Sequence, residues 1–241
     1  MKNKIFSLIL LLCLVTTAIF GTSVFANATD SYDFHFNKET VENKPILFLG
    51  DSITARYGLD SEDVDYMQFL QDETGFYYAN KAVSGATYVT REDNNDLFHQ
   101  VDKSRTLIRD CEIVSIWLGT NDFSRRYPLG ATTDNPTDIN EITTICGAMR
   151  YNIDLIREIN PEIKIMILSP AYRVAGKNGL NLYLTDYIDT IESMCEVLRV
   201  KHVKTYDLFG ESDYQNYLNP DNLHFIEAGY RLIADRILGR V

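Results

Sequence analysis

The chain has 241 residues, of which 45% are hydrophobic, and its 34 acidic and 23 basic residues give a net charge of −11. This length is enough for one domain with a sizeable core. Nucleic acids and anionic membrane surfaces repel a negatively charged protein, so the composition argues against both as partners.

The first residues have the features of a secretory signal peptide. Lys2 and Lys4 precede an apolar run from Ile5 to Phe20, and Val24-Phe25-Ala26 fits a cleavage site with small residues. We therefore expect residues 1–26 to be removed and the protein to be secreted, with no stable membrane anchor after cleavage. The alternative is that the segment remains as an uncleaved N-terminal anchor.

The remaining chain is interpreted as an extension followed by one domain. Residues 27–44 are polar and aromatic without clear periodicity, and residues 45–241 are expected to form the domain. An odd number of cysteines is a poor disulfide framework, so the three that remain are expected to be small buried hydrophobes. They are Cys111, Cys146 and Cys195. No spacing of Cys, His or carboxylate residues resembles a metal site, and neither a metal nor another cofactor is expected.

Short apolar runs alternate with helical patterns from residue 45 onward. Strands are expected at Ile46–Leu49, Tyr77–Lys81, Ile113–Leu118, Lys164–Leu168 and Val203–Tyr206, and the clearest helices at Ile139–Ile159, Leu182–Val200 and Glu227–Leu238. This alternation predicts an α/β fold, a three-layer α/β/α sandwich around a mainly parallel five-stranded sheet. In such sheets, ligands bind at the carboxyl ends of the strands.

Reactive residues follow these strand ends. The first strand runs into GDS, which ends at Ser52; the second is followed by NKAVSGAT with Gly85, and the third by GTND with Asn121. Before the last helix, Asp221 lies three residues ahead of His224. A serine hydroxyl needs a base to become nucleophilic, and that base needs a third group to fix its tautomer. Backbone and asparagine N–H groups can stabilise an oxyanion.

Each segment also has a purely structural explanation. Glycine and aspartate suit a turn, and an aspartate three residues before a histidine is typical of a helix cap. Asp51 and Asp122 are interpreted as structural acids, Asp122 bracing its own loop. The other histidines of the domain and extension, His35, His99 and His202, are expected to have no acid partner at a telling spacing.

Taken together, the four segments resemble the SGNH hydrolases, also called GDSL lipases and esterases. The blocks appear in the family's order and span nearly the whole domain, although Ala82 stands where many members carry glycine. The resemblance implies that Ser52 is the nucleophile, His224 the general base and Asp221 the residue that orients it. It also implies an oxyanion hole formed by the amides of Ser52 and Gly85 and the Asn121 side chain, and the fold already expected from periodicity.

Two loops supply candidates for substrate binding. Residues 123–138 form a long polar loop that is expected to overhang the site, and residues 171–181 follow the fourth strand. The candidates are Arg125, Arg126, Tyr127, Tyr172 and Arg173. Their polar and aromatic character favours a small-molecule or glycan ester, foremost a short acyl (acetyl) ester of a carbohydrate. A lipid acyl hydrolase, such as a lysophospholipase or thioesterase, and an inactive glycan-binding protein are the alternatives. The sequence indicates no particular oligomeric state.

Overall fold

The computed structural model describes residues 34–241, whose five strands form one all-parallel sheet in the order β2-β1-β3-β4-β5. The strands are β1 (Pro45–Gly50), β2 (Tyr77–Asn80), β3 (Ile113–Trp117), β4 (Lys164–Leu168) and β5 (Lys201–Val203). The expected α/β fold is confirmed. The fifth strand ends three residues earlier than expected, because Leu168 is the last residue of β4 and its pairing with Val203 is the last of that ladder.

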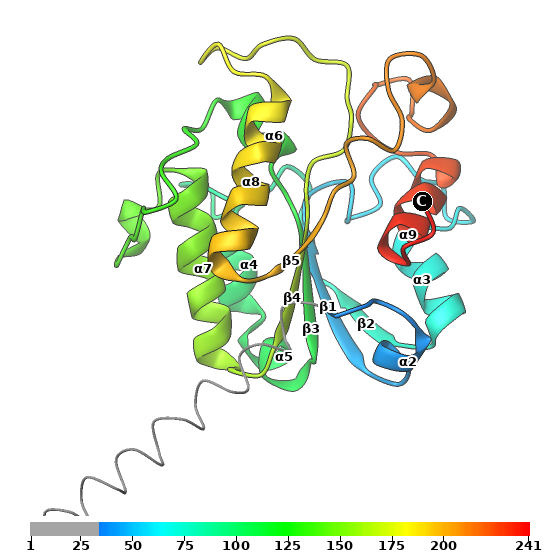
Figure 1. Cartoon of the computed structure of the whole chain (residues 1–241), viewed down its shortest axis with the longest axis horizontal. Helices are drawn as coiled ribbons and strands as arrows, with labels where there is room; N and C mark the ends of the chain where they lie inside the picture. The colour runs from blue at the N-terminus through cyan, green and yellow to red at the C-terminus, as the bar shows by residue number, and fades with distance from the viewer. Residues whose placement is uncertain (1–33) are drawn as a thin grey trace, which may run out of the picture.

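Helices cover both faces of the sheet (Figure 1). They are α2 (Lys38–Val41), α3 (Tyr66–Thr74), α4 (Leu97–Lys103), α5 (Arg105–Asp110), α6 (Thr120–Arg125), α7 (Ile145–Ile159), α8 (Leu184–Leu198) and α9 (Glu227–Ile237), with short 3₁₀ turns η1 (Ile139–Glu141) and η2 (Tyr214–Asn216). Alternate residues of each strand face opposite sides. Leu47 and Leu49 of β1 join a core with α4, α5, α7 and α8, whereas Ile46 and Phe48 join a second core with α2, α3 and α9.

The helix expected at residues 139–159 begins later than periodicity indicates. Thr144 accepts a hydrogen bond at its side chain from the Gly147 N–H (3.1 Å) and so caps α7, which starts at Ile145. Residues 139–141 form the separate turn η1. The apolar periodicity therefore continues through Thr144, although the helix begins only after this capping residue.

Residues 34–44 pack against the domain. Phe34, Phe36 and Val41 are buried, and the Phe36 ring meets the Phe76 ring edge to face at a centroid distance of 5.7 Å. The expected signal peptide, residues 1–26, lies outside the described residues. Among the described residues, no helix has the length and apolar character needed to cross a membrane.

Replacing Phe36 with alanine tests whether this segment is an integral part of the fold. Phe36 is 2% exposed, and removing a buried phenylalanine side chain costs about 3–5 kcal/mol of unfolding free energy. We expect a loss of that order in urea unfolding for Phe36→Ala, whereas Lys38→Ala, whose side chain is 66% exposed, should stay within about 0.5 kcal/mol of the wild type. Equal stability of the two variants would show that the segment contributes nothing to the core.

Candidate active site

Ser52 is positioned by the abrupt end of β1. A Cβ atom on Gly50 would lie 2.6 Å from Thr54 Oγ1 and 2.9 Å from the Trp117 carbonyl oxygen, so only glycine allows this approach. Successive turns follow, in which the Tyr57 N–H donates to the Ser52 carbonyl (2.9 Å). The strand therefore does not lead straight into a helix at the serine, because the next helix, α3, begins only at Tyr66.

Three side chains from distant parts of the chain form a continuous hydrogen-bonded series. Ser52 Oγ lies 2.8 Å from His224 Nε2, and His224 Nδ1 lies 2.6 Å from Asp221 Oδ2. Since a carboxylate only accepts hydrogen bonds, Nδ1 carries the donated proton and Nε2 is left to accept from the serine hydroxyl. This is the arrangement of nucleophile, base and orienting acid that activates a serine.

The carboxylate of Asp221 is held in its charged form by its neighbours. Burial acts to raise its pKa, but hydrogen bonds from the His224 side chain and from the backbone N–H groups of His224 and Leu223 outweigh this and lower it. The same oxygen, Oδ1, accepts both backbone bonds, which leaves Oδ2 for the imidazole. Asp221 therefore caps its own turn and orients the base at the same time.

The oxyanion donors implied by the family resemblance differ in how they are engaged. Gly85 has a φ of +80°, a conformation that favours glycine. Within residues 34–241, the backbone N–H groups of Ser52 and Gly85 donate to no acceptor. Asn121 Nδ2, in contrast, donates to Asp51 Oδ2 (3.2 Å) and to the Ala86 carbonyl (3.1 Å). An oxyanion would have to share or replace one of these Asn121 bonds.

Two buried carboxylates brace the loops that carry these donors. Burial raises the pKa of Asp51 and of Asp122 to about 7. Asp51 accepts from the Ile53 N–H (2.9 Å) as well as from Asn121, and so joins the loops after β1 and β3. Asp122 was expected to brace its own loop, but its carboxylate accepts from the Tyr88 and Val89 N–H groups of the loop after β2.

Tyr57 is a residue of the site that sequence reasoning missed. Its ring lies 4.5 Å from the His224 ring between centroids, at 47°, and its residue surface is 57% exposed. The sequence shows only that an aromatic residue lies five positions after Ser52. A tyrosine at that position could equally be part of the core, so the sequence alone does not assign it to the site. In the structure, Tyr57 offers an exposed aromatic ring beside His224.

Of the predicted substrate-binding residues, Arg173 interacts electrostatically with two acids of the site. Burial lowers its pKa while the charges of Asp51 and Asp221 raise it, which places Arg173 in the field of both carboxylates. Its Nη1 donates to Thr120 Oγ1 (3.0 Å) and Ser124 Oγ (2.9 Å).

The other candidates make different contacts. The Tyr172 ring packs in an aromatic group with Tyr206, Phe209 and Tyr214, whereas Arg125 is exposed on α6 and Arg126 is exposed just after it. Tyr127 lines a pocket beside the loop after β2. The loop of residues 123–138, which is expected to overhang the site, is attached to α7. Its Pro128 and Leu129 carbonyls accept from the first N–H groups of α7, and Arg150 binds the Thr132 and Asp134 carbonyls.

A second aspartate–histidine pair contradicts the expectation for His99. Asp96 lies three residues before His99, the same spacing as in Asp221 and His224, and both of its carboxylate oxygens are 2.9 Å from His99 Nδ1. No serine, threonine or cysteine within residues 34–241 is hydrogen-bonded to the other nitrogen of His99. The spacing of an aspartate three residues before a histidine therefore occurs twice within residues 34–241, and of these two histidines only His224 is hydrogen-bonded to a serine.

Cysteine thiols and potential metal ligands are further reactive side chains within residues 34–241. Cys111, Cys146 and Cys195 are buried and free, as small hydrophobes are. Across residues 34–241, no group of three His, Cys, Asp or Glu side chains could hold a metal ion.

A model of the GDSL-like lipase/acylhydrolase family matches residues 48–232, which include Ser52, Gly85, Asn121, Asp221 and His224. The chain belongs to this family. As a GDSL-like acylhydrolase it is a carboxylic ester hydrolase. The search of curated proteins gave no match.

Solved structures share the fold of this GDSL-like acylhydrolase. A protein from Lactobacillus plantarum is 27% identical with a TM-score of 0.69, over 83% of this chain and 96% of that one. A possible lipase from Chitinophaga pinensis is 17% identical (TM-score 0.60; 82% and 97% covered). A catalytic mutant of the acetylxylan esterase Axe2 from Geobacillus stearothermophilus is 21% identical (TM-score 0.56; 83% and 94% covered).

Replacing Asn121 with alanine tests its contribution to the oxyanion hole. Loss of one oxyanion donor lowers kcat by about 10²–10³-fold and leaves KM less affected, because the bond forms in the transition state. We expect this result for Asn121→Ala in steady-state ester hydrolysis. The control is Asn216→Ala on η2, an exposed amide whose side chain makes no hydrogen bond within residues 34–241. A change in KM alone would assign Asn121 to ground-state binding.

The buried Asp51 should make stability depend on pH. Its pKa is about 7 in the folded protein against an ordinary 3.8, so between these values the folded state holds a proton that the unfolded chain has lost. The free energy of unfolding should therefore fall as pH rises from 4 to 7, by up to about 1.4 kcal/mol per pH unit from this group.

Comparison with Asp51→Asn isolates this contribution, because an asparagine side chain does not titrate and the other groups remain. Urea unfolding at several pH values should give a shallower slope for Asp51→Asn than for the wild type, whereas the exposed-site variant Asp60→Asn should keep the wild-type slope. Parallel curves for all three proteins would mean that Asp51 keeps an ordinary pKa in the folded state.

Proposed function

We propose that this chain is a secreted serine esterase that cleaves short acyl esters of carbohydrates, foremost acetyl esters, through an acyl-enzyme. The observation that carries the proposal is the series from Ser52 through His224 to Asp221, at 2.8 and 2.6 Å. Secretion is inferred from the charged and apolar pattern of residues 1–26.

In the proposed first step, Ser52 Oγ attacks the ester carbonyl carbon while His224 Nε2 takes the hydroxyl proton. The imidazolium that forms is stabilised by Asp221. The carbonyl oxygen becomes an oxyanion, and the unengaged N–H groups of Ser52 and Gly85 are available to it, with Asn121 as a third donor. Collapse of this intermediate breaks the ester bond, and His224 gives its proton to the departing alcohol.

Deacylation reverses the roles of the same groups. A water molecule takes the place of the alcohol, His224 accepts its proton, and the oxygen attacks the acyl carbon. The second tetrahedral intermediate expels Ser52 Oγ, which regains its proton from His224. The carboxylic acid is released and the serine is restored.

The carbohydrate preference is proposed from the polar character of the surroundings. Arg173 and the exposed Tyr57 stand near the reacting groups and offer hydrogen-bonding and aromatic contacts that suit a hydroxylated alcohol. A short acyl group suits a nucleophile that is only 7% exposed. The acetylxylan esterase among the similar structures shares the fold at 21% identity, so the substrate is argued from this chain's own residues.

A second candidate, hydrolysis of longer acyl chains, is favoured by exposed apolar side chains on loops that leave the same edge of the sheet. Tyr57 follows β1, Val83 follows β2, and Val174 and Leu180 follow β4, each about half exposed or more. Such residues could contact an acyl chain or a lipid surface.

The Ser52→Ala variant tests the nucleophile. Loss of a triad member should lower ester hydrolysis by about 10³-fold or more, measured with p-nitrophenyl acetate and with an acetylated xylo-oligosaccharide. Ser193→Ala, on α8, serves as the matched serine control and should retain wild-type rates. Undiminished activity of Ser52→Ala would refute the proposed mechanism.

The chain-length profile of the wild type separates the two candidates. Rates that fall from p-nitrophenyl acetate through butyrate to octanoate would support the short-acyl esterase. A rise toward octanoate would support the lipid acyl hydrolase.

A further inference from the structure

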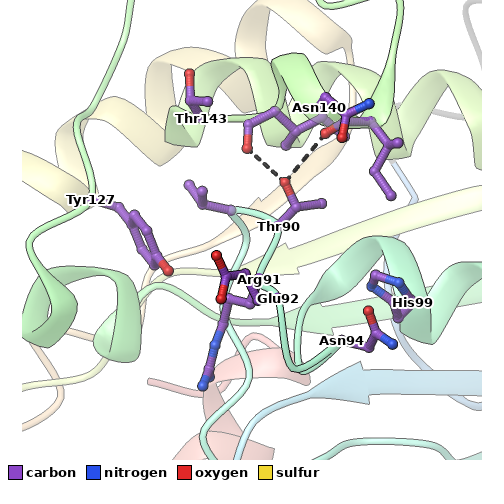
Figure 2. A pocket seen from close by; sticks show the side chains of 11 residues that line it. Thr90, Arg91, Glu92, Asn94, His99, Tyr127, Asn140 and Thr143 are labelled. Atoms are coloured by element: carbon purple, nitrogen blue, oxygen red, sulfur yellow. Dashed lines mark hydrogen bonds between the residues drawn. The ribbon is translucent and has the colours of Figure 1, made fainter.

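A pocket of about 440 Å³ lies beside the loop that carries Gly85. Its walls come from residues 89–92 and Asn94, from His99 in α4, from Tyr127 just after α6, and from residues 139, 140, 142 and 143 (Figure 2). Small-molecule sites commonly have volumes of about 300–1,000 Å³. The pocket therefore has the size of a ligand site, and the triad does not use it.

Internal hydrogen bonds fix the walls of this pocket. Thr90 Oγ1 donates to the carbonyls of Ile142 (2.8 Å) and Ile139 (3.4 Å), which joins its two long walls, as the dashed lines in Figure 2 show. The Arg91 N–H donates to Asp96 (2.9 Å), the residue that also holds His99. A wall fixed in this way loses little conformational entropy when a ligand binds.

Arg91 connects the pocket to the catalytic centre. Its Nη1 donates to the Gly85 carbonyl (2.8 Å), and the N–H of the same glycine is one of the proposed oxyanion donors. The buried Asp122 holds the backbone N–H groups of Tyr88 and Val89, so the stretch between the glycine and the pocket is also fixed. Arg91 thus lines the pocket and also contacts the residue that carries a proposed oxyanion donor.

Several polar groups that line the pocket have no hydrogen-bond partner among the described residues. They are the side chains of Glu92, Asn94, Tyr127 and Thr143, together with His99 Nε2. They include both donors and acceptors, and Tyr127 adds the face of an aromatic ring. Figure 2 shows Tyr127 and His99 on opposite sides of the pocket.

This chemistry selects a neutral, hydroxylated ligand. A hydroxyl group both donates and accepts hydrogen bonds, as the mixed lining requires, and the C–H face of a sugar ring suits an aromatic wall. An anion is disfavoured, because Glu92 lines the pocket, the Arg91 guanidinium is already bonded to Gly85 and Asp93, and the chain has a net charge of −11. A long acyl chain would leave the polar groups unsatisfied.

We propose that this pocket is a carbohydrate subsite that binds a sugar residue of the ester substrate and places the acylated position next to Ser52. The proposal rests on the proposed esterase function for its role in catalysis, but binding itself can be measured without ester cleavage. The polar groups of the lining would bind the sugar hydroxyls, and Tyr127 would pack against the ring.

Binding of neutral tetrasaccharides tests the subsite directly. Xylotetraose, cellotetraose and mannotetraose, all without acyl groups, are titrated into the full protein by calorimetry. We expect at least one to bind, and Tyr127→Ala to weaken that binding by about tenfold. Thr143→Val, which preserves side-chain shape at an exposed position, should weaken it by about threefold. Tyr77→Ala, an exposed tyrosine on β2 outside the pocket, is the matched control and should bind as the wild type does.

Kinetics then relate the subsite to catalysis. For acetylated forms of the bound tetrasaccharide, the pocket variants should raise KM more than they lower kcat, and the loss of kcat/KM should exceed the loss on p-nitrophenyl acetate. Failure of all three tetrasaccharides to bind, or equal binding by wild type and both pocket variants, would overturn the subsite even if esters are cleaved. Selective loss of binding in a protein that cleaves no ester would support the subsite and refute the esterase.

Discussion

The site depends on one hydrogen bond between residues 172 positions apart, the bond from Ser52 Oγ to His224 Nε2. The serine belongs to the turns after β1, and the histidine to the segment before α9, so the two must be held together by other contacts. Buried Tyr230 of α9 supplies one, because its hydroxyl donates to the carbonyl of Ile53, the residue next to the serine (2.5 Å). The Asn219 N–H supplies another constraint, since it donates to the His224 carbonyl (2.7 Å) and closes the loop behind the base.

The oxyanion side is organised by buried carboxylates. Burying a charge is costly unless hydrogen bonds compensate it, and Asp51 and Asp122 receive theirs in part from other loops. Asp51 ties the nucleophile's turn to Asn121, and Asp122 ties α6 to the backbone that follows Gly85. The loops that leave β1, β2 and β3 are therefore cross-linked at the edge of the sheet where the chemistry is proposed. Burial raises the pKa of both carboxyl groups to about 7, and the hydrogen bonds that cross-link the loops act in the opposite direction.

Much of the fold could be predicted from sequence because a parallel sheet buried on both faces needs continuous apolar strands and amphipathic helices. The start of α7 was misplaced because Ile139 and Ile142 continue the apolar period across the Thr144 cap. Ser52, His224 and Asp221 could be proposed from sequence because four short motifs occur in the order of a known family, and the structure adds the hydrogen bonds among them. Tyr57, Arg91 and the role of Asp122 could not, because each acts through contacts between segments that the sequence pattern does not bring together.

The two aspartate–histidine pairs show what a local motif determines and what it leaves to the fold. In both, an aspartate three residues ahead accepts from the histidine backbone N–H and from Nδ1, so local geometry alone orients the ring. Because Nδ1 is bonded to the aspartate, Nε2 is the nitrogen that can contact a group from another part of the chain or a ligand. For His224 that group is Ser52 Oγ, which suits the proposed role of a base. His99 instead lines a pocket with polar walls, where the same nitrogen is available to a ligand as a hydrogen-bond acceptor. The role of each aspartate–histidine pair therefore depends on the group that faces the histidine Nε2.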